Sequence, residues 1–291
     1  MAVLDELQAA AQAVRSQVAP ATVGVGRDGR GCGVVIAAGQ VVTNSHNLRD
    51  RTTTVRFADG RVAPATVAGI DADGDLAVLA VDTGTTTPIA WSDTPARTGD
   101  IVFAVGRDPS GERVTMGMIS AISRSFRGPR GRRIDGSVEH TAPLAPGSSG
   151  GPLVDRDGHL IAINTHRVGR GFYLAVPADA SLRSRVDDLA RGQSVERRRL
   201  GVAIVPARVA RRLRRAVGLP DRDGLLVRAV EPDSPAAAAG LRQGDLLVRA
   251  GATALTDPDE LFAAIDAAPE TLELGVVRGV EELVVTASFA A

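Results

Sequence analysis

Short apolar runs alternate with turns of Gly, Asp and Pro between residues 21 and 177. The runs are rich in Val, Ile and Thr, which suit the pleated, half-buried environment of a strand. The predicted strands are residues 33–36, 52–57, 75–81, 100–105, 114–122 and 160–164. Many short strands at this spacing are typical of a β-sandwich or a β-barrel. A helix over 180–190 is predicted to close the region, because Leu182, Val186 and Leu189 fall on one face.

The chain from Leu200 to Phe289 has a mixed pattern of strands and helices. The predicted strands are residues 201–205, 224–230, 245–249, 272–277 and 282–287. One predicted helix carries Val209, Leu213 and Val217 on a single stripe and stops at Gly218, and we expect this stripe to pack on the domain. A second helix is predicted after Asp257, which begins a capping box and is followed by Pro.

The stretch between these two regions is polar and rich in Arg, as is typical of a linker. We therefore predict a first domain over residues 1–190, a linker over 191–199 and a second domain over 200–291. A chain of 291 residues is long enough for two domains that each bury a core.

The amino-acid composition limits which binding partners and which cellular compartment we expect for this protein. The 34 basic and 34 acidic residues balance, so no overall field would attract nucleic acid or an anionic membrane. The single cysteine, Cys32, excludes an intramolecular disulfide framework and is predicted to be a small buried residue. The opening residues include Asp5 and Glu6 where an export signal would be basic, and no apolar run approaches the length of a membrane span. The expected location is cytoplasmic.

The strongest candidate chemistry is a set of three side chains in the order His, Asp, Ser. Ser149 lies in the run Gly-Ser-Ser-Gly-Gly-Pro over 147–152, His46 ends a Thr-Asn-Ser-His run, and Asp75 precedes an apolar strand. A serine hydroxyl becomes a nucleophile when an imidazole takes its proton, and a carboxylate holds that imidazole in the correct tautomer. The order is that of the two-barrel chymotrypsin architecture.

Two neighbouring carboxylates compete with Asp75 for the third role. Asp71 and Asp73 stand with Gly74 in a sequence typical of a turn, whereas Asp75 directly abuts the buried strand. Asp75 is therefore the preferred candidate. Gly147 and Gly150 flank Ser149 where the chain must bend and aim backbone N–H groups at a developing oxyanion. No nucleotide or metal motif is present, and the histidines lack metal-ligand spacing, so no cofactor and no metal are expected.

Several motifs resemble those of the HtrA (Deg) family of serine proteases. The run 41–46 resembles the family's VxTNAH, 75–79 its DLAVL, and 147–153 its GNSGGPL. Residues 234–245 resemble the SPAAxAGLxxGD of a PDZ domain, and 200–202 its carboxylate-binding loop. Ser45 and Ser148 depart from the family's usual Ala and Asn. The resemblance implies a mainly β fold, in which a chymotrypsin-like double β-barrel is followed by a small mixed α/β PDZ domain.

The resemblance also implies an activity. The catalytic residues would be His46, Asp75 and Ser149, and the N–H groups of Gly147 and Ser149 would form the oxyanion hole. The protein would be an ATP-independent serine endopeptidase that degrades unfolded or damaged proteins. Pro143 stands where trypsin-like specificity requires an acidic residue, so small or medium apolar P1 residues are expected rather than Arg or Lys.

The PDZ-like region would bind C-terminal peptide segments and tune the activity. Leu200, Gly201 and Val202 would hold the terminal carboxylate, and the peptide would add a strand beside 202–205. Leu261 and Ile265 would line the side-chain pocket, although Ile265 fits an ordinary core position equally well. The resemblance also implies a homotrimer that assembles through the protease domains with the help of the N-terminal segment. The alternative function is a non-catalytic PDZ-containing binding or holdase protein in which the barrel is structural.

Overall fold

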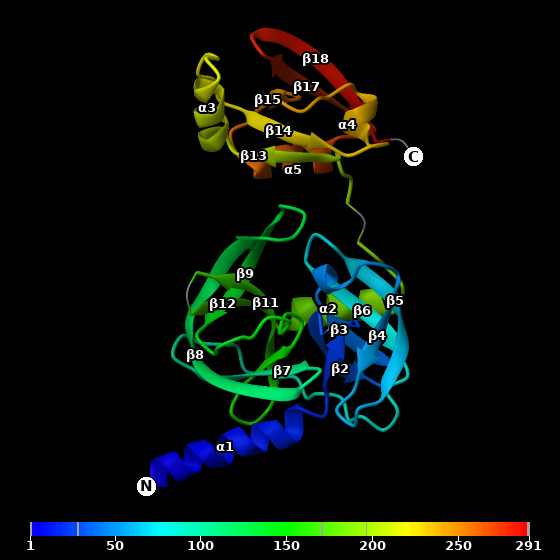
Figure 1. Ribbon diagram of the computed structural model, residues 1–291, viewed down its shortest axis with the longest axis vertical. Helices are drawn as coiled ribbons and strands as arrows, with labels where there is room; N and C mark the ends of the chain where they lie inside the picture. The colour runs from blue at the N-terminus through cyan, green and yellow to red at the C-terminus, as the bar shows by residue number, and fades with distance from the viewer. Residues whose placement is uncertain (1, 28, 170, 196, 290–291) are drawn as a thin grey trace. The chain divides into compact units, whose positions relative to one another are not determined.

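The computed structural model describes residues 2–27, 29–169, 171–195 and 197–289. The chain divides into two compact units, Met1–Glu196 and Arg197–Ala291 (Figure 1). The division falls within the stretch 191–199 that the sequence predicts as a linker.

The first unit contains two closed six-stranded barrels. The strands of the first barrel are β1 (Thr22–Val25), β2 (Gly31–Ala37), β3 (Gln40–Thr43), β4 (Thr52–Arg56), β5 (Val62–Asp71) and β6 (Leu76–Val81), in the order β1-β2-β3-β6-β5-β4. The second barrel contains β7 (Ile101–Asp108), β8 (Gly111–Arg127), β9 (Arg133–His140), β10 (Pro152–Val154), β11 (Leu160–Val168) and β12 (Phe172–Pro177), in the order β10-β11-β12-β9-β8-β7. Closure leaves no strand edge unpaired in either sheet. The predicted double barrel is confirmed.

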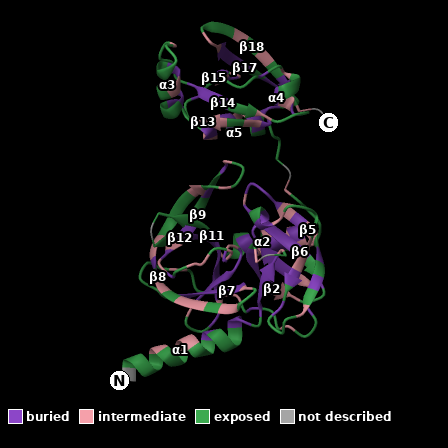
Figure 2. Cartoon of the chain, in the orientation of Figure 1, coloured by how far each residue is buried: buried purple, intermediate pink, exposed green. Residues whose placement is uncertain are grey.

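Buried aliphatic side chains fill the barrels, and the strands that carry them are coloured as buried in Figure 2. Helix α2 (Ala180–Ala190) packs on this core through Leu182, Val186 and Leu189, which are the three residues predicted to share a face. Asp179 caps the helix by accepting a hydrogen bond from the N–H of Leu182.

Helix α1 (Ala2–Val18) begins the first unit and is buried only at its C-terminal end. Val14 and Val18 belong to the barrel core, whereas Leu4 is 71% exposed (Figure 2). An ion pair between Arg15 and Glu112 joins the helix to β8. No helix in the described part of the chain is long and apolar enough to cross a membrane.

The second unit combines an antiparallel sheet with three helices. Its strands are β13 (Val202–Val205), β14 (Leu225–Val230), β15 (Leu246–Ala250), β16 (Thr253–Ala254), β17 (Thr271–Arg278) and β18 (Glu281–Ser288), and its helices are α3 (Ala207–Ala216), α4 (Pro235–Ala238) and α5 (Pro258–Ala267). The sheet order is β13-β14-β15-β17-β18, with β16 paired to β15, so β13 lies at an edge. The capping box predicted at Asp257 is present at the start of α5. The mixed α/β architecture predicted for this region is confirmed.

The buried face of α3 differs from the predicted stripe. Val209 is 43% exposed and Val217 is 72% exposed, whereas Ala207, Ala210 and Arg214 are buried. Small alanines let the helix approach β14 closely, and the Arg214 guanidinium donates hydrogen bonds to the carbonyls of Pro220 and Gly279. Leu213 is half-buried and packs against the core as predicted, but the prediction was wrong for Val209 and Val217. It chose the face by hydrophobicity alone, whereas the close approach of the alanines and the hydrogen bonds from Arg214 to two carbonyls decide which residues are buried.

Candidate active site

His46 and Asp75 meet at the ends of two paired strands. β3 pairs with β6 in antiparallel register, so the residues that follow Thr43 lie beside the residue that precedes Leu76. The 3-10 turn η1 (Ser45–Asn47) then directs the His46 ring toward the Asp75 carboxylate. His46 Nδ1 lies 2.8 Å from Asp75 Oδ2 and 2.9 Å from Oδ1. With Nδ1–H donated to the carboxylate, Nε2 is left as the proton acceptor.

Three further donors hold the Asp75 carboxylate, which is almost fully buried. Its oxygens accept from Ser45 Oγ at 3.0 Å, from the N–H of His46 at 3.1 Å and from Thr165 Oγ1 at 2.7 Å. The backbone at Asp75 is left-handed, with φ of 55°, a conformation that Asp tolerates better than most residues. A buried carboxylate with this many donors has a single orientation.

Asp71 and Asp73, the two alternatives to Asp75, interact with groups other than His46. Asp71 Oδ1 accepts the N–H of Gly74 at 2.8 Å, which is the turn role that the sequence predicts. Asp73 is buried beside Arg132, with 3.3 Å between Oδ2 and Nε. Within the described residues, neither carboxylate contacts His46.

Ser149 lies in a turn that only glycines can form. Gly147 and Gly150 have φ of 84° and 88°, and an added Cβ would lie 2.4 Å from the Gly29 carbonyl oxygen and 2.2 Å from the Cys32 carbonyl oxygen, respectively. Among the described residues, none accepts a hydrogen bond from the N–H of Gly147 or Ser149, so both donors are available to an oxyanion.

The hydroxyl of Ser149 points to a backbone carbonyl in this structure. Ser149 Oγ donates to the carbonyl of Thr165 at 3.0 Å, and the described part of the site has no hydrogen bond between Oγ and His46. Thr165 thus contacts two of the three candidate residues, through its carbonyl and its own hydroxyl. The sequence analysis missed it. The available signal was a polar pair, Asn164 and Thr165, at the end of the apolar run 160–163.

A buried histidine supports the segment that follows the nucleophile. His140 is fully buried, and its Nε2 lies 2.9 Å from Asn164 Oδ1. Asn164 in turn donates to the carbonyls of Gly151 and Pro152, and its own carbonyl accepts the N–H of Gly150. Burial lowers the pKa of His140 to about 4, and the hydrogen bond to Asn164 opposes this only partly.

The free energy of unfolding should therefore fall when the pH decreases from about 6.5 toward about 4. The unfolded chain binds a proton at His140 in this window while the folded chain does not, so the stability contribution is present above the window and lost within it. The largest loss from this residue is about 3 kcal/mol. Urea unfolding at pH 7 and 4.5 should show a smaller difference for His140→Leu than for the wild type or for the control His159→Leu, at a histidine that is only half-buried.

One cluster has the residue types of a metal site. Ligand atoms of Asp155, Asp157 and His159 lie within 4.8 Å of one another on the turn between β10 and β11. Asp155 Oδ1 already accepts the N–H groups of Asp157 and His159, so the turn itself accounts for the position of that carboxylate.

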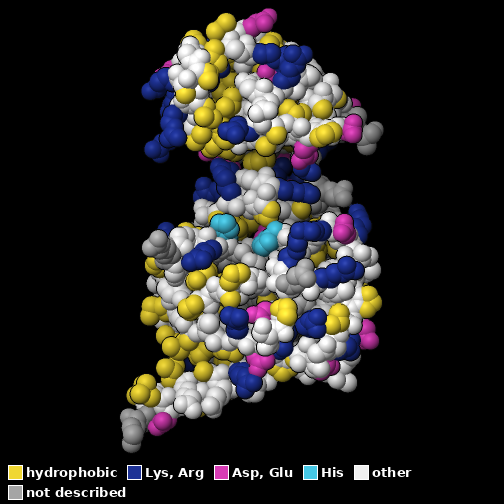
Figure 3. All heavy atoms as spheres, in the orientation of Figure 1, with side chains coloured by type: hydrophobic (Ala, Val, Ile, Leu, Met, Phe, Trp, Pro, Cys, Tyr) yellow, Lys and Arg dark blue, Asp and Glu magenta, His cyan; other side chains and the backbone are white. Residues whose placement is uncertain are grey.

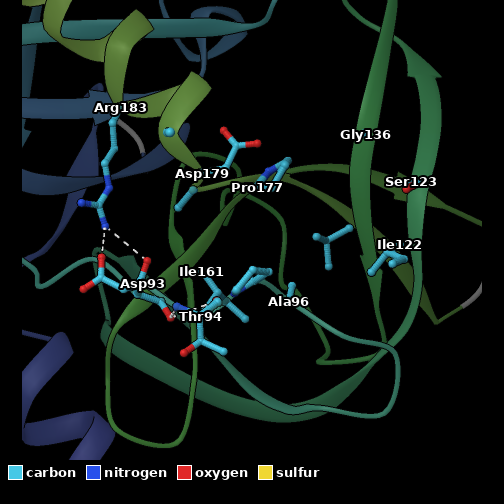
Figure 4. Close-up of a pocket in the computed structure, with 15 residues that line it drawn as sticks. Asp93, Thr94, Ala96, Ile122, Ser123, Gly136, Ile161, Pro177, Asp179 and Arg183 are labelled. Carbon is cyan, nitrogen blue, oxygen red and sulfur yellow. Dashed lines mark hydrogen bonds and ion pairs between the residues drawn. The ribbon is translucent and has the colours of Figure 1, made fainter.

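Cavities lie within the first unit, and two of them differ in how they relate to the candidate site. One, of about 280 Å³, is bounded by β7, β8 and the segment 143–148 that leads to Ser149. There Thr115 Oγ1 donates to the carbonyl of Pro143 at 2.7 Å, which ties β8 to this segment. The other, of about 460 Å³, is shown in Figure 4 and is not lined by any of the three candidate catalytic residues. Arg183 closes its rim by donating to Ser92 and Asp93.

The candidate peptide-binding residues of the second unit fall into two groups. Gly201 and Val202 lie at the start of the edge strand β13, and Gly201 has φ of 82° in a position where a Cβ would lie 2.2 Å from that of Ser234. Leu200, Leu261 and Ile265 are at most 3% exposed and belong to the core of this unit.

Comparison with known proteins identifies both units. A model of the trypsin-like peptidase domain matches residues 31–163, and a PDZ domain model matches residues 226–278. The putative serine protease HhoA of Synechocystis sp. is 33% identical over 90% of this chain and 71% of its own length. A probable periplasmic serine endoprotease, DegP-like, of Halomonas elongata is 35% identical over 75% of this chain. The chain spans only 47% of that relative.

Solved structures agree with this result. The HtrA-type protease AlgW, in a complex with a decapeptide, is 26% identical over 96% of this chain and 97% of its own length, with a TM-score of 0.61. Both domain types and the order in which they occur therefore match, and the chain belongs to the HtrA family of serine proteases.

Proposed function

We propose that this protein is an ATP-independent serine endopeptidase that degrades unfolded or damaged proteins. The observation that carries the proposal is the hydrogen bond between the buried Asp75 carboxylate and His46 Nδ1, together with Ser149 in a glycine-flanked turn whose N–H groups have no acceptor among the described residues. This is the arrangement that hydrolysis of a peptide bond through an acyl-enzyme requires.

In the proposed mechanism Ser149 Oγ leaves the Thr165 carbonyl and turns to His46 Nε2. His46 accepts the hydroxyl proton as Oγ attacks the peptide carbonyl, and Asp75 stabilises the imidazolium that forms. The N–H groups of Gly147 and Ser149 donate to the oxyanion. His46 then gives its proton to the leaving amine, and water completes hydrolysis by the same route. With Pro143 in place of an acidic residue, the proposed P1 residue is small or medium and apolar.

A fluorophosphonate probe tests this function directly. The probe reacts only with a serine that an adjacent base activates, so the enzyme should be labelled at Ser149 and should then lose the ability to cleave casein. A holdase with a structural barrel would remain unlabelled. Absence of labelling at neutral pH would therefore reject the catalytic proposal in favour of the binding protein.

We also propose that the second unit binds C-terminal peptide segments. β13 is an edge strand, to which an extended peptide can add through backbone hydrogen bonds. Gly201 bends the chain immediately before this edge, where backbone N–H groups around Leu200–Val202 would receive the carboxylate. Leu261 and Ile265 are buried in the core of this unit. They would line the pocket for the peptide side chain only if that side chain reached this core.

A peptide with a free apolar C-terminus should bind, and the same peptide with a C-terminal amide should bind far more weakly. The reason is that N–H donors interact with a carboxylate about twice as strongly as with a neutral acceptor. Calorimetric titration of the full chain carrying Ser149→Ala measures the affinity without cleavage. Occupancy should change turnover of the wild type by roughly 5- to 150-fold, as in typical couplings. Equal affinity of the two peptides would reject carboxylate recognition.

We further propose a homotrimer assembled through the N-terminal segment. Leu4 on α1 and Ile101, Met116 and Met118 on the barrel surface are each more than 40% exposed. Figure 3 shows hydrophobic side chains gathered on the flank of the first unit that borders α1. Covering such surface would favour association. Sedimentation of the full chain should give the trimer mass, and a monomer at micromolar concentration would contradict the proposal.

A further inference from the structure

Asn47, the residue that follows His46, donates a hydrogen bond to the backbone of the candidate nucleophile Ser149. Asn47 is 3% exposed and lies between the two barrels of the first unit. Its Nδ2 donates to the backbone carbonyl of Ser149 at 2.8 Å and to Thr43 Oγ1 at 3.0 Å. The 3-10 turn η1 therefore carries the candidate general base, His46. The next residue in the same turn, Asn47, donates to Ser149, which His46 would activate.

These contacts form part of a closed ring of hydrogen bonds. The N–H of Cys32 donates to the same Ser149 carbonyl at 2.8 Å, and Thr43 Oγ1 donates to the Cys32 carbonyl at 2.6 Å. Both lone pairs of the Ser149 carbonyl are thus used, one by β2 and the other by Asn47. The backbone of Ser149 is fixed to the first barrel, although Ser149 itself belongs to the second.

The surrounding chain is shaped to admit this amide. An added Cβ on Gly31 would lie 2.1 Å from Asn47 Cγ, and one on Gly150 would lie 3.0 Å from Asn47 Nδ2. Real Cβ contacts are not as short as the one at Gly31, so glycine at position 31 leaves the space that Asn47 fills, and the contact at Gly150 would be tight. An amide suits this space because its NH₂ group offers two donors to two acceptors, which neither an aliphatic side chain nor a carboxylate provides.

We propose that Asn47 is a positioning residue for the nucleophile. The Ser149 carbonyl is held by Asn47 and Cys32, so the backbone stays in place while the hydroxyl leaves the Thr165 carbonyl for His46 Nε2. A backbone free to shift would instead lose alignment with both the base and the oxyanion donors, and small misplacements are costly in rate. The inference rests on the proposed function, because it assigns Ser149 as the nucleophile.

The test compares Asn47→Leu with the wild type. Leu has nearly the same shape as Asn but no donor, so kcat should fall by about 10- to 100-fold, as expected for one lost hydrogen bond to a reacting residue. KM should stay within about two-fold, since substrate contacts are unchanged. The rate of fluorophosphonate labelling should fall by the same factor as kcat. The low-field proton signal of the His46–Asp75 hydrogen bond should remain.

A matched control separates positioning from general stability. Thr22 is a fully buried polar residue of the same barrel whose Oγ1 donates to the Val18 carbonyl, away from Ser149. Thr22→Val should lower the melting temperature and leave the labelling rate per folded molecule unchanged. Asn47→Ala is the second variant, in case Leu does not pack in the space.

The outcomes distinguish this inference from the proposed function. Labelling of Asn47→Leu and Asn47→Ala at the wild-type rate overturns the role of Asn47 and leaves the protease assignment intact. Failure of both variants to fold would make Asn47 a structural residue and would also overturn the inference. A wild type that resists labelling rejects the proposed function itself.

Discussion

Ser149→Ala is expected to abolish cleavage of casein while the fold remains unchanged. The substitution removes the only atom that would form the acyl bond, and losses in comparable enzymes are about 10⁴-fold or more in kcat. The folded state loses only the hydrogen bond from Oγ to the Thr165 carbonyl, which contributes about 1 kcal/mol. Release of labelled casein fragments measures the activity, and circular dichroism with thermal unfolding measures the fold.

The neighbouring serine supplies the control. Ser148 is 9% exposed, and its Oγ lies near Gly106 of β7. Ser148→Ala should retain most of the activity. If Ser148→Ala abolished cleavage while Ser149→Ala preserved it, the assignment of the nucleophile would be wrong.

Asp75→Asn should reduce kcat by about 10⁴-fold, as the same change does in chymotrypsin-like enzymes. Asn has nearly the same shape and also tolerates the left-handed φ of 55°, so the backbone need not move. The amide, however, can donate to His46 Nδ1, which would place the imidazole proton on Nε2, where the serine proton must be accepted. KM should change little because the carboxylate is buried away from substrate.

The pH dependence of kcat and the melting temperature complete this test. The loss should appear in kcat throughout the neutral pH range, because the wrong tautomer presents a donor rather than an acceptor to Ser149. Asp82→Asn, at an exposed carboxylate that accepts the N–H of Gly84, should leave kcat unchanged. A decrease in kcat of less than about 10-fold for Asp75→Asn would show that another group orients His46.

Local patterns in the sequence determined most of the secondary structure. The predicted helix over 180–190 has the same bounds as α2, because its aliphatic spacing and its Asp cap both act within a few residues. The strands not named from their pattern are β1, β3, β5, β9, β10, β12 and β16. These elements are short, contain Pro or Gly, or are flanked by further strand-forming residues, so their bounds depend on the partners they meet in the barrel.

The buried face of α3 shows a limit of hydrophobic periodicity. Arg214 is buried, although Arg is the residue type that such patterns assign to solvent. Its burial depends on two carbonyl acceptors, of Pro220 and Gly279, and the second lies far along the chain. A pattern read within one helix contains no information about acceptors on another element.

The sequence by itself determined the identity and order of the three candidate catalytic residues, because each stands in a short run whose chemistry is local. It also favoured Asp75 over Asp71 and Asp73 as the carboxylate partner of His46, since only Asp75 abuts the buried strand. Only the tertiary structure decided which groups hold these residues in place. Thr165 forms hydrogen bonds with both Asp75 and Ser149, and Asn47 donates a hydrogen bond to the Ser149 carbonyl. These contacts join residues 90 and 102 positions apart, and 16 in the closest case. The two longer-range contacts join residues of the two different barrels, which no local pattern encodes.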